Sequence, residues 1–239
     1  MNYPYRLTPM DKWHQQRGAR MVEVSGWRRV VDYGDPDAEI AAVRSSVGLG
    51  DATPLTKIDA RGRHSARILG GLWKVPEVGE CGLAVSAQAS GSLAYIVRLT
   101  AERFIILGSP EEGQQLYTRL TDVAAGDTCA HVTDVTSAYA VLQLAGPLST
   151  KLLKKLGSSR IDSVTTDRCL QGPLARVHVL LVRRDVGNVR SWLLFVSRDF
   201  GEYLWECVLW GGREFGIRPF GTAAERAFGF VEAADVPVV

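Results

Sequence analysis

The fold is decided near the start of the chain, which reads TPMDKWH (residues 8–14), GARMV (18–22), SGW (25–27) and YG (33–34). Directly after these runs, residues 35–47 carry the first helix signal, because Pro36 stands at a first-turn position and apolar residues recur at helical spacing. Gly48 predicts the end of this helix.

Short β-prone segments follow, with turn residues between them. They cover residues 56–60, 83–87, 93–99 and 103–107, and together they predict a sheet. Residues 63–72 have Ile68, Leu69 and Leu72 at helical spacing and predict a helix packed on that sheet, and residues 111–120 show a similar pattern.

The second half of the chain mixes the same elements. Residues 134–144 predict a strand, and Gly146-Pro147 opens a helix that runs to Leu156. The segments that complete the order are a hairpin of residues 175–183 and 191–197, a helix over 200–210, and a last strand or short helix near 223–232. From this order of elements we predict an α+β fold with antiparallel sheets. No Gly- or Ser-rich linker separates the halves, so we expect interlocked α/β subdomains.

Composition limits the classes to which the chain can belong. Hydrophobic residues make up 46% of the 239 residues and charged residues 23%, as in soluble globular proteins. The net charge of +2 is too small for electrostatic binding of nucleic acid. The four cysteines form no C-x-x-C pair, and no apolar run is long enough for a membrane span. We therefore expect a cytoplasmic protein that binds neither nucleic acid nor membrane.

Isolated polar and aromatic residues give weaker signals. The sequence assigns no partner to His14, and a lone histidine is more often structural than catalytic. The same holds for His64, His131 and His178, so we expect no metal site. We interpret the arginine cluster 183, 184 and 190 as a solvated surface. Core packing is favoured over ligand stacking for most of the aromatic residues Trp73, Tyr95, Tyr139, Trp192, Trp205 and Trp210.

The opening runs closely resemble the start of the glycine-cleavage T-protein, a folate-dependent aminomethyltransferase family. That family reads T-P-L-x-x-x-H, G-A-R-M-V, A-G-W and Q-Y in the same order. Further resemblances are found at residues 43–51 (A-V-R-x-x-x-G-x-F-D), 55–62 (M-G-K-I-x-x-x-G), 141–147 (L-x-x-x-G-P) and 226–233 (R-D-x-x-R-L-E-A, in length). The 141–147 turn is closer to the related domain of sarcosine and dimethylglycine dehydrogenases.

The resemblance implies the T-protein folate-binding fold and stops where the family's C-terminal β-barrel would begin, so we expect that barrel to be absent. It implies a first folate-binding subdomain of residues 1–50 and 134–239, and an inserted second subdomain of residues 51–133. A missing barrel would expose apolar surface, so we expect a homo- or hetero-oligomer.

The resemblance also implies tetrahydrofolate as the cofactor, bound in a central hole. The family uses an aspartate in a G-G-x-x-D-D-L-I-V strand because positive charge develops on the one-carbon unit. Here Leu93 and Ala94 stand at the acidic positions, and neither carries charge or a proton. Asn188 stands where a family glutamate pairs with the pterin. The candidate cofactor-binding residues are Leu55, Tyr95, Asn188, Arg226 and Glu232, and no catalytic residue is assigned.

Two functions are compatible with these observations. The first is a tetrahydrofolate-dependent one-carbon transferase or demethylase-like protein with an altered active site, in which Tyr95 or Glu232 replaces the missing acid and a small amine or methyl or methoxy compound is the donor. The second is a non-catalytic folate-binding or scaffold subunit of a larger oxidase or demethylase complex, like the small subunit of heteromeric sarcosine oxidases. The sequence leaves open whether the chain is an enzyme.

Overall fold

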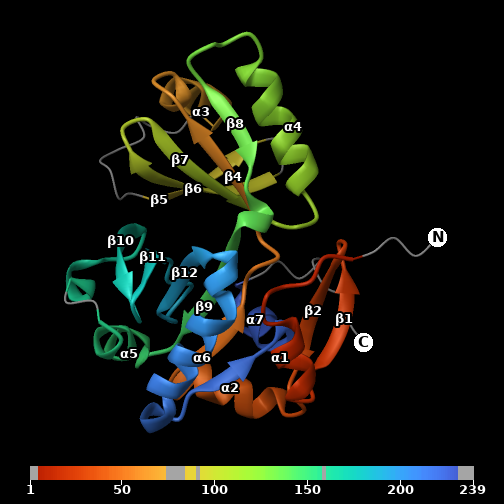
Figure 1. Ribbon diagram of the computed structural model, residues 1–239, viewed down its shortest axis with the longest axis vertical. Helices are drawn as coiled ribbons and strands as arrows, with labels where there is room; N and C mark the ends of the chain where they lie inside the picture. Colours follow the sequence, from red (N-terminus) through yellow and green to blue (C-terminus); the bar gives the residue numbers. More distant parts are fainter. Residues whose placement is uncertain (1–4, 74–83, 90–91, 158–159, 231–239) are drawn as a thin grey trace. The chain divides into compact units, whose positions relative to one another are not determined.

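The computed structural model describes residues 5–73, 84–89, 92–157 and 160–230 (Figure 1). Its contacts divide the chain into two compact units, which we describe one at a time. Unit 1 comprises Met1–Pro54, Ala138–Thr166 and Leu170–Val239, and unit 2 comprises Leu55–Ser137 with Asp167–Cys169. The chain therefore leaves unit 1 after Pro54 and returns to it at Ala138.

Unit 1 is built on a six-stranded sheet of order β10-β11-β12-β9-β3-β13. The strands are β3 (Gly48–Asp51), β9 (Tyr139–Ala145), β10 (Arg168–Leu174), β11 (Val177–Arg183), β12 (Ser191–Ser197) and β13 (Arg218–Phe220). The pairs β11–β12, β12–β9 and β9–β3 are antiparallel, which confirms the predicted hairpin, whereas β13 pairs with β3 in parallel. Almost every residue of β9 and β12 is buried, because both strands lie inside the sheet.

Helices pack on this sheet through their apolar sides. They are α1 (Asp11–Gln16), α2 (Pro36–Ser45), α5 (Ser149–Lys155), α6 (Gly201–Gly211) and α7 (Thr222–Phe228), and a two-stranded sheet of β1 (Arg20–Val24) and β2 (Trp27–Asp32) accompanies them. The predicted first helix is confirmed as α2: the Asp35 side chain accepts a hydrogen bond from the Ala38 N–H at 3.0 Å, and Pro36 fills the first turn.

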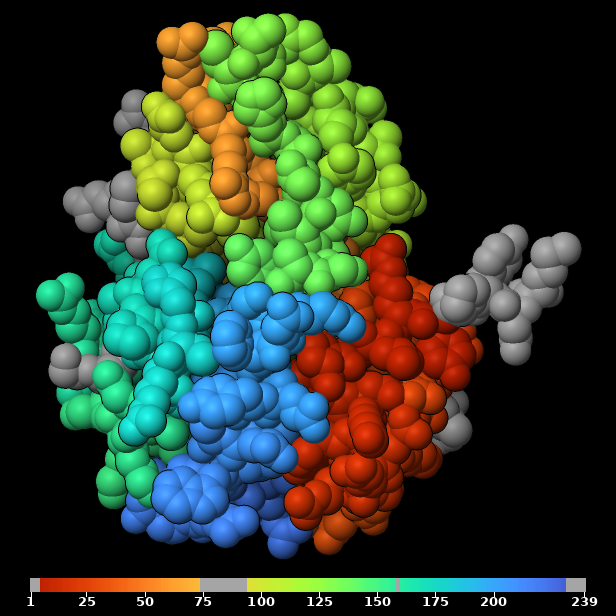
Figure 2. All heavy atoms as spheres, viewed as in Figure 1, coloured from red at the N-terminus to blue at the C-terminus, as the bar shows by residue number. Residues whose placement is uncertain are grey.

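The opening run of the sequence enters the core of unit 1. Met10 and Trp13 belong to the same buried cluster as Leu142, Trp192 and Trp205. The rings of Trp13 and Trp205 meet edge to face, with centroids 5.3 Å apart. Figure 2 shows α6, in light blue, beside the N-terminal segments in red. The short opening motifs therefore matter for packing as well as for recognition of the fold.

Unit 2 contains a five-stranded antiparallel sheet of order β5-β6-β7-β4-β8. Its strands are β4 (Thr56–Arg61), β5 (Ala84–Ala89), β6 (Ser92–Thr100), β7 (Arg103–Gly108) and β8 (His131–Asp134), and its helices are α3 (Ser65–Trp73) and α4 (Gly113–Ala124). Alternate strand residues such as Ala94, Ile96 and Phe104 form one buried cluster with Leu69 of α3 and Leu120 of α4. Both predicted helices therefore cover the same face of the sheet.

The predicted single strand over residues 134–144 is wrong. β8 ends at Asp134, a 3₁₀ turn (Thr136–Ala138) follows, and β9 begins at Tyr139 in the other unit. The Asp134 carboxylate accepts a hydrogen bond from the Thr136 N–H at 2.8 Å, which stabilises the turn. The alternation of apolar residues continues across the turn, so periodicity alone does not reveal the break. The β1–β2 pair and β10 were not predicted.

The turn between β9 and α5 depends on Gly146. This residue has φ +120°, and a Cβ atom built on it would lie 2.5 Å from the Ser46 carbonyl oxygen. Its N–H donates to the Arg190 carbonyl at 2.8 Å. The predicted Gly-Pro turn is confirmed, and close approach of backbone explains the glycine. None of the helices in the described part of the chain has the length and hydropathy needed to span a lipid bilayer.

Candidate functional site

Tyr95 lies in β6 and is 4% exposed. Its neighbours Ala94 and Ile96 face the core of unit 2, so strand alternation places Tyr95 on the opposite face. The Tyr95 hydroxyl donates a hydrogen bond to Oδ1 of Asp167 at 2.8 Å. Asp167 belongs to the short segment that joins unit 2 from later in the chain, and its φ is +58°. A carboxylate therefore lies beside β6, although it does not come from that strand.

Leu55 is the first residue of unit 2 and is half-buried. Its carbonyl oxygen accepts a hydrogen bond at 2.8 Å from Nζ of Lys57, whose side chain is fully buried. A buried ammonium group needs such acceptors to offset its loss of water. The backbone of Leu55 thus has a structural role, and the side chain remains a predicted folate contact.

Asn188 is exposed at the tip of the β11–β12 connection. Val186 and Val189 exchange backbone hydrogen bonds of 3.0 Å on either side of it, and Gly187 supplies a φ of +55°. Arg183 holds the adjacent Asp185, with Nη2 2.7 Å from Oδ2. Arg183 is thus part of a half-buried ion pair, which corrects its interpretation as a solvated surface residue.

Arg226 is half-buried and lies in the last turn of α7, while Glu232 lies outside the described residues. Val186 and Val189 pack in the same apolar cluster as Phe228 and Phe230, which follow Arg226 in the chain. The structure therefore brings the turn that carries Asn188 and the end of the helix that carries Arg226 into one cluster of unit 1. In unit 2 it brings Tyr95 to Asp167.

A buried chain of hydrogen bonds links the opening run to β3. The Tyr33 hydroxyl lies 2.8 Å from Nδ1 of His14, and Nε2 of His14 lies 3.1 Å from Oδ2 of Asp51. Burial raises the pKa of Tyr33 well above its usual range, and the carboxyl groups of Asp51 and Glu39 raise it further. The Tyr33 hydroxyl therefore stays protonated and donates its hydrogen bond to Nδ1 of His14. The hydrogen that His14 directs at Asp51 is then on Nε2.

The charge on Asp51 is stabilised inside this chain of hydrogen bonds. Burial by itself would raise the pKa of the Asp51 carboxyl, but the hydrogen bond from His14 outweighs it, with Thr53 acting in the same direction, and the pKa is lowered. The backbone N–H of Thr53 also donates to Oδ1 at 3.0 Å. The sequence assigned His14 no partner, whereas the structure gives it two, and with 1% exposure its role is structural.

Arg29 and Glu225 form a second buried charge pair, with Nη2 2.8 Å from Oε2. Burial raises the pKa of Glu225, although the charges of Arg29 and Arg226 act in the opposite direction. Asp51 also raises this pKa, so the two carboxyl groups lie near each other. The pair ties β2 to α7, the helix that presents Arg226.

His64, Asp127 and Cys129 bring one possible metal-ligand atom each within 4.8 Å of one another in unit 2. Nothing in the sequence indicated this group, because Asp127 and Cys129 lie 63 and 65 residues after His64 and the three follow no ligand spacing.

The aromatic residues considered for ligand stacking differ in burial. Trp73, Tyr95, Trp192 and Trp205 are buried, as expected for core residues, and Tyr139 is half-buried. Trp210 differs, because 68% of it is exposed on α6. The prediction that most of these rings pack in the core is confirmed, with Trp210 as an exception.

Asp167 and Glu225 are two further polar residues that sequence analysis missed. Asp167 follows two threonines in an irregular segment, and nothing in its neighbours indicates that it reaches a strand some 70 residues earlier. Glu225 precedes Arg226, and helical spacing alone does not show which of the two is buried. Only the tertiary structure reveals their partners.

A sequence profile of the GCVT N-terminal domain matches residues 10–230. An aminomethyltransferase of Streptomyces avermitilis is 29% identical over 90% of this chain and 60% of that protein. The sarcosine oxidase subunit alpha of Corynebacterium sp. strain P-1 is 31% identical over 92% of this chain and 25% of that subunit.

Among solved structures, the glycine cleavage system aminomethyltransferase T from Bartonella henselae superposes with a TM-score of 0.83 at 18% identity, covering 93% of this chain and 61% of that one. This match confirms the predicted fold. The chain spans about 60% of the length of these aminomethyltransferases.

Proposed function

Because the chain belongs to the GCVT N-terminal domain family, we propose that it binds tetrahydrofolate and takes part in one-carbon transfer or demethylation with an altered active site. The hydrogen bond between Tyr95 and Asp167 is the observation that carries this proposal. The donor would be a small amine or a methyl or methoxy compound, and the site of action the cytoplasm.

Two observations around β6 support the proposal of folate binding. Ala94, at one of the family's acidic positions, is 1% exposed and packs in the core of unit 2. Asp167 supplies a carboxylate on the other face of the strand, oriented by the Tyr95 hydroxyl at 2.8 Å. A carboxylate can accept hydrogen bonds from amino groups and stabilise nearby positive charge. Tetrahydrofolate would supply the one-carbon carrier, and Asp167 would hold charge beside it.

Isothermal titration of the full chain with tetrahydrofolate tests the proposal. Asp167→Asn and Tyr95→Phe should each weaken binding by about ten-fold or more, as expected for the loss of a hydrogen bond to a charged group. Tyr139→Phe, a half-buried tyrosine of unit 1, is the control and should bind as the unchanged chain does. Absence of binding heat at millimolar tetrahydrofolate would contradict the proposal.

A second candidate is a folate-binding or scaffold subunit of a larger oxidase or demethylase complex. It is supported by the 31% identity to a subunit of sarcosine oxidase, of which this chain covers 25%. Co-purification from the native host should then recover a larger oxidase with this chain in fixed stoichiometry. A lone monomer that turns over a methyl or aminomethyl donor with tetrahydrofolate would favour the first candidate.

A further inference from the structure

Glu39 lies in the first turn of α2, and with 3% exposure its carboxyl group is buried inside unit 1. Acidic residues in the first turn of a helix usually remain in water, where they interact with the helix dipole. A buried carboxylate needs hydrogen-bond donors to offset its loss of water. The donors at Glu39 therefore show what this side chain holds together.

Both oxygens of the Glu39 carboxylate accept hydrogen bonds from backbone N–H groups. Oε1 accepts from Tyr33 at 2.6 Å, and Oε2 accepts from Gly221 at 3.0 Å. Tyr33 directly follows β2, whereas Gly221 directly precedes α7 and lies 182 residues from Glu39 in the sequence. Burial raises the pKa of this carboxyl group, and the two N–H groups act in the opposite direction. One side chain of α2 thus joins the end of β2 to the start of α7.

Gly221 is a point of close contact between α7 and β2. A Cβ atom on Gly221 would overlap the Val31 carbonyl oxygen of β2, so a residue without a side chain is needed there. The Gly221 carbonyl accepts hydrogen bonds of 3.1 Å from the N–H groups of Ala224 and Glu225, in the first turn of α7. The hydrogen bond to Glu39 therefore fixes the residue from which α7 starts.

A second connection holds the same helix to the same strand. Nη2 of Arg29, in β2, lies 2.8 Å from Oε2 of Glu225, in α7. A helix of seven residues is not stable by itself, so the contacts of α7 with β2 and α2 decide its place (Figure 1). Arg226 directly follows Glu225, and its position therefore depends on both connections.

We propose that Glu39 is a positioning residue for Arg226: its two carboxylate oxygens hold the start of α7 at the end of β2, and this places Arg226 for contact with folate. The folate part of this inference rests on the proposed function, for which Arg226 is a candidate cofactor-binding residue. A carboxylate is needed because it offers two acceptors. A glutamine of the same length has one acceptor, and its amide group would direct donors at one of the two N–H groups.

Amide hydrogen exchange, measured by NMR on the full chain without folate, tests the role of Glu39 in holding α7. In the unchanged chain, the N–H of Gly221 should be protected although it precedes the helix. In Glu39→Gln, the amides of residues 221–229 should exchange about ten-fold faster, because a hydrogen bond that opposes the opening of α7 is lost. The amides of α4 (Gly113–Ala124), in unit 2, should exchange as before.

Asp35→Ala is the matched control in the same helix. The Asp35 side chain accepts a hydrogen bond from the Ala38 N–H at 3.0 Å, so its loss weakens the start of α2. Both hydrogen bonds of Glu39 remain in this variant, and residues 221–229 should exchange as in the unchanged chain. The control thus separates the loss of these two hydrogen bonds from a general weakening of α2.

Isothermal titration with tetrahydrofolate tests whether Glu39 acts through Arg226. Glu39→Gln and Arg226→Gln should each weaken binding by about five- to ten-fold, the effect of one hydrogen bond. The double variant should bind no more weakly than Arg226→Gln alone, because the two residues act as one unit. Asp35→Ala should bind as the unchanged chain does, and circular dichroism checks that each variant is folded.

Three results would overturn the inference: a Gly221 amide without protection in the unchanged chain, the same α7 exchange in Glu39→Gln as in the unchanged chain, or a further loss of affinity when Glu39→Gln is added to Arg226→Gln. The first two need no ligand and are independent of the proposed function. Absence of binding heat with the unchanged chain would contradict the proposed function, and with it the folate role of Glu39, while the exchange data decide separately whether Glu39 holds α7.

Discussion

Two buried carboxyl groups of unit 1, Asp51 and Glu225, have pKa values shifted in opposite directions. Asp51 accepts hydrogen bonds from His14 and from the Thr53 N–H, whereas Glu225 has a buried guanidinium as its partner. The pH dependence of stability should therefore differ between them, because stability rises with pH wherever the unfolded chain binds more protons.

For Asp51, the folded-state pKa lies below its ordinary value of 3.8, so its contribution to stability is present above that pH and is lost as the pH falls through the folded value. Asp51→Asn should lower the free energy of unfolding by about 2–3 kcal/mol at neutral pH, the range for a hydrogen bond to a charged group. Urea denaturation across the acid range should show this difference shrinking below the ordinary value. A difference that does not vary with pH would contradict the assignment.

For Glu225, the folded-state pKa lies above its ordinary value of 4.5, so its contribution is greatest below that pH and is lost as the pH rises through the folded value. Arg29→Ala removes the charge that opposes the rise of this pKa and leaves the carboxyl group buried without its partner, so it should cost about 3–5 kcal/mol at neutral pH. The cost should be smaller at acid pH, where Glu225 is protonated. Glu225→Gln in the Arg29→Ala background should recover part of the loss in the same denaturation experiment.

At the level of single elements, the sequence predicted helices better than boundaries between units. The helix α2 followed from Pro36 and its apolar spacing, and α3 and α4 from apolar residues that the structure buries on one face. The strand break after Asp134 was missed, since a turn set by one aspartate and one threonine does not interrupt the apolar pattern. The β1–β2 pair was missed because its strands are only partly buried along β1.

The turn before α5 provides a test of backbone geometry. Gly146 and Gly157 have similar φ values, +120° and +126°, but only Gly146 has backbone atoms where a Cβ would lie. Both Gly→Ala variants therefore carry strain from positive φ, of the order of 1–3 kcal/mol. Gly146→Ala should cost more than Gly157→Ala, because the Ser46 carbonyl lies at 2.5 Å from the added atom.

Thermal and urea unfolding of the two variants measure the difference. Equal losses of stability would show that the backbone near Ser46 moves away without cost.

At the level of the whole molecule, the sequence predicted the fold through short motifs in a fixed order, and the structural match confirms it. The candidate site was predicted only in part, because the sequence indicated Tyr95 but not its hydrogen-bond partner. The segment of Asp167 joins unit 2 across about 70 residues of sequence, and no local pattern encodes such a contact. Propensity and periodicity describe neighbours along the chain, whereas this site depends on neighbours in space.

Three exposed aromatic residues of unit 1 form a candidate surface for the expected oligomer. Phe200, Tyr203 and Trp210 are 49%, 44% and 68% exposed and lie at helical spacing along α6 and the turn before it. Light scattering after size exclusion should give a mass above that of the monomer, and Tyr203→Ser with Trp210→Ser should lower it. Each of these two substitutions should change the free energy of unfolding of the monomer by no more than about 0.5 kcal/mol, because both side chains are exposed. A monomeric mass at every concentration would contradict the expectation.

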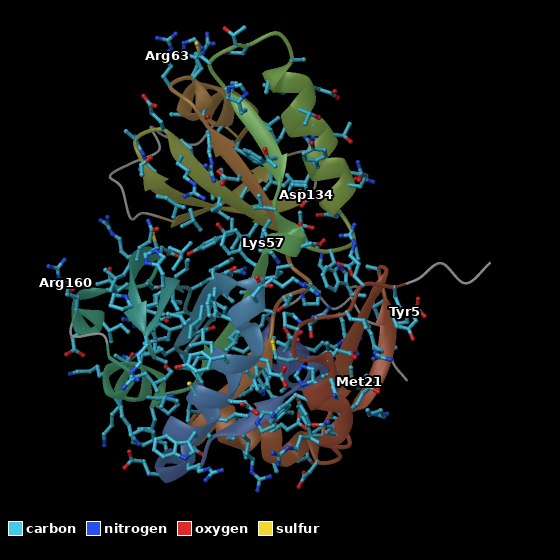
Figure 3. All side chains as sticks on the ribbon, in the orientation of Figure 1. Tyr5, Met21, Lys57, Arg63, Asp134 and Arg160 are labelled. Atoms are coloured by element: carbon cyan, nitrogen blue, oxygen red, sulfur yellow. The ribbon has the colours of Figure 1, made fainter. Side chains whose placement is uncertain are left out.

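The pairing of β4 with β8 holds together the two ends of the main segment of unit 2. Ile58 pairs with Asp134 and Arg61 with His131, so the incoming and outgoing ends of the 55–137 insertion run side by side (Figure 3 labels Lys57 and Asp134 there). The two ends of this segment are thus held next to each other by backbone pairing, independently of the loops between them. Asp167 lies outside residues 55–137 in the sequence, so any segment that replaced those residues would need its own hydrogen-bond partner for the Asp167 carboxylate.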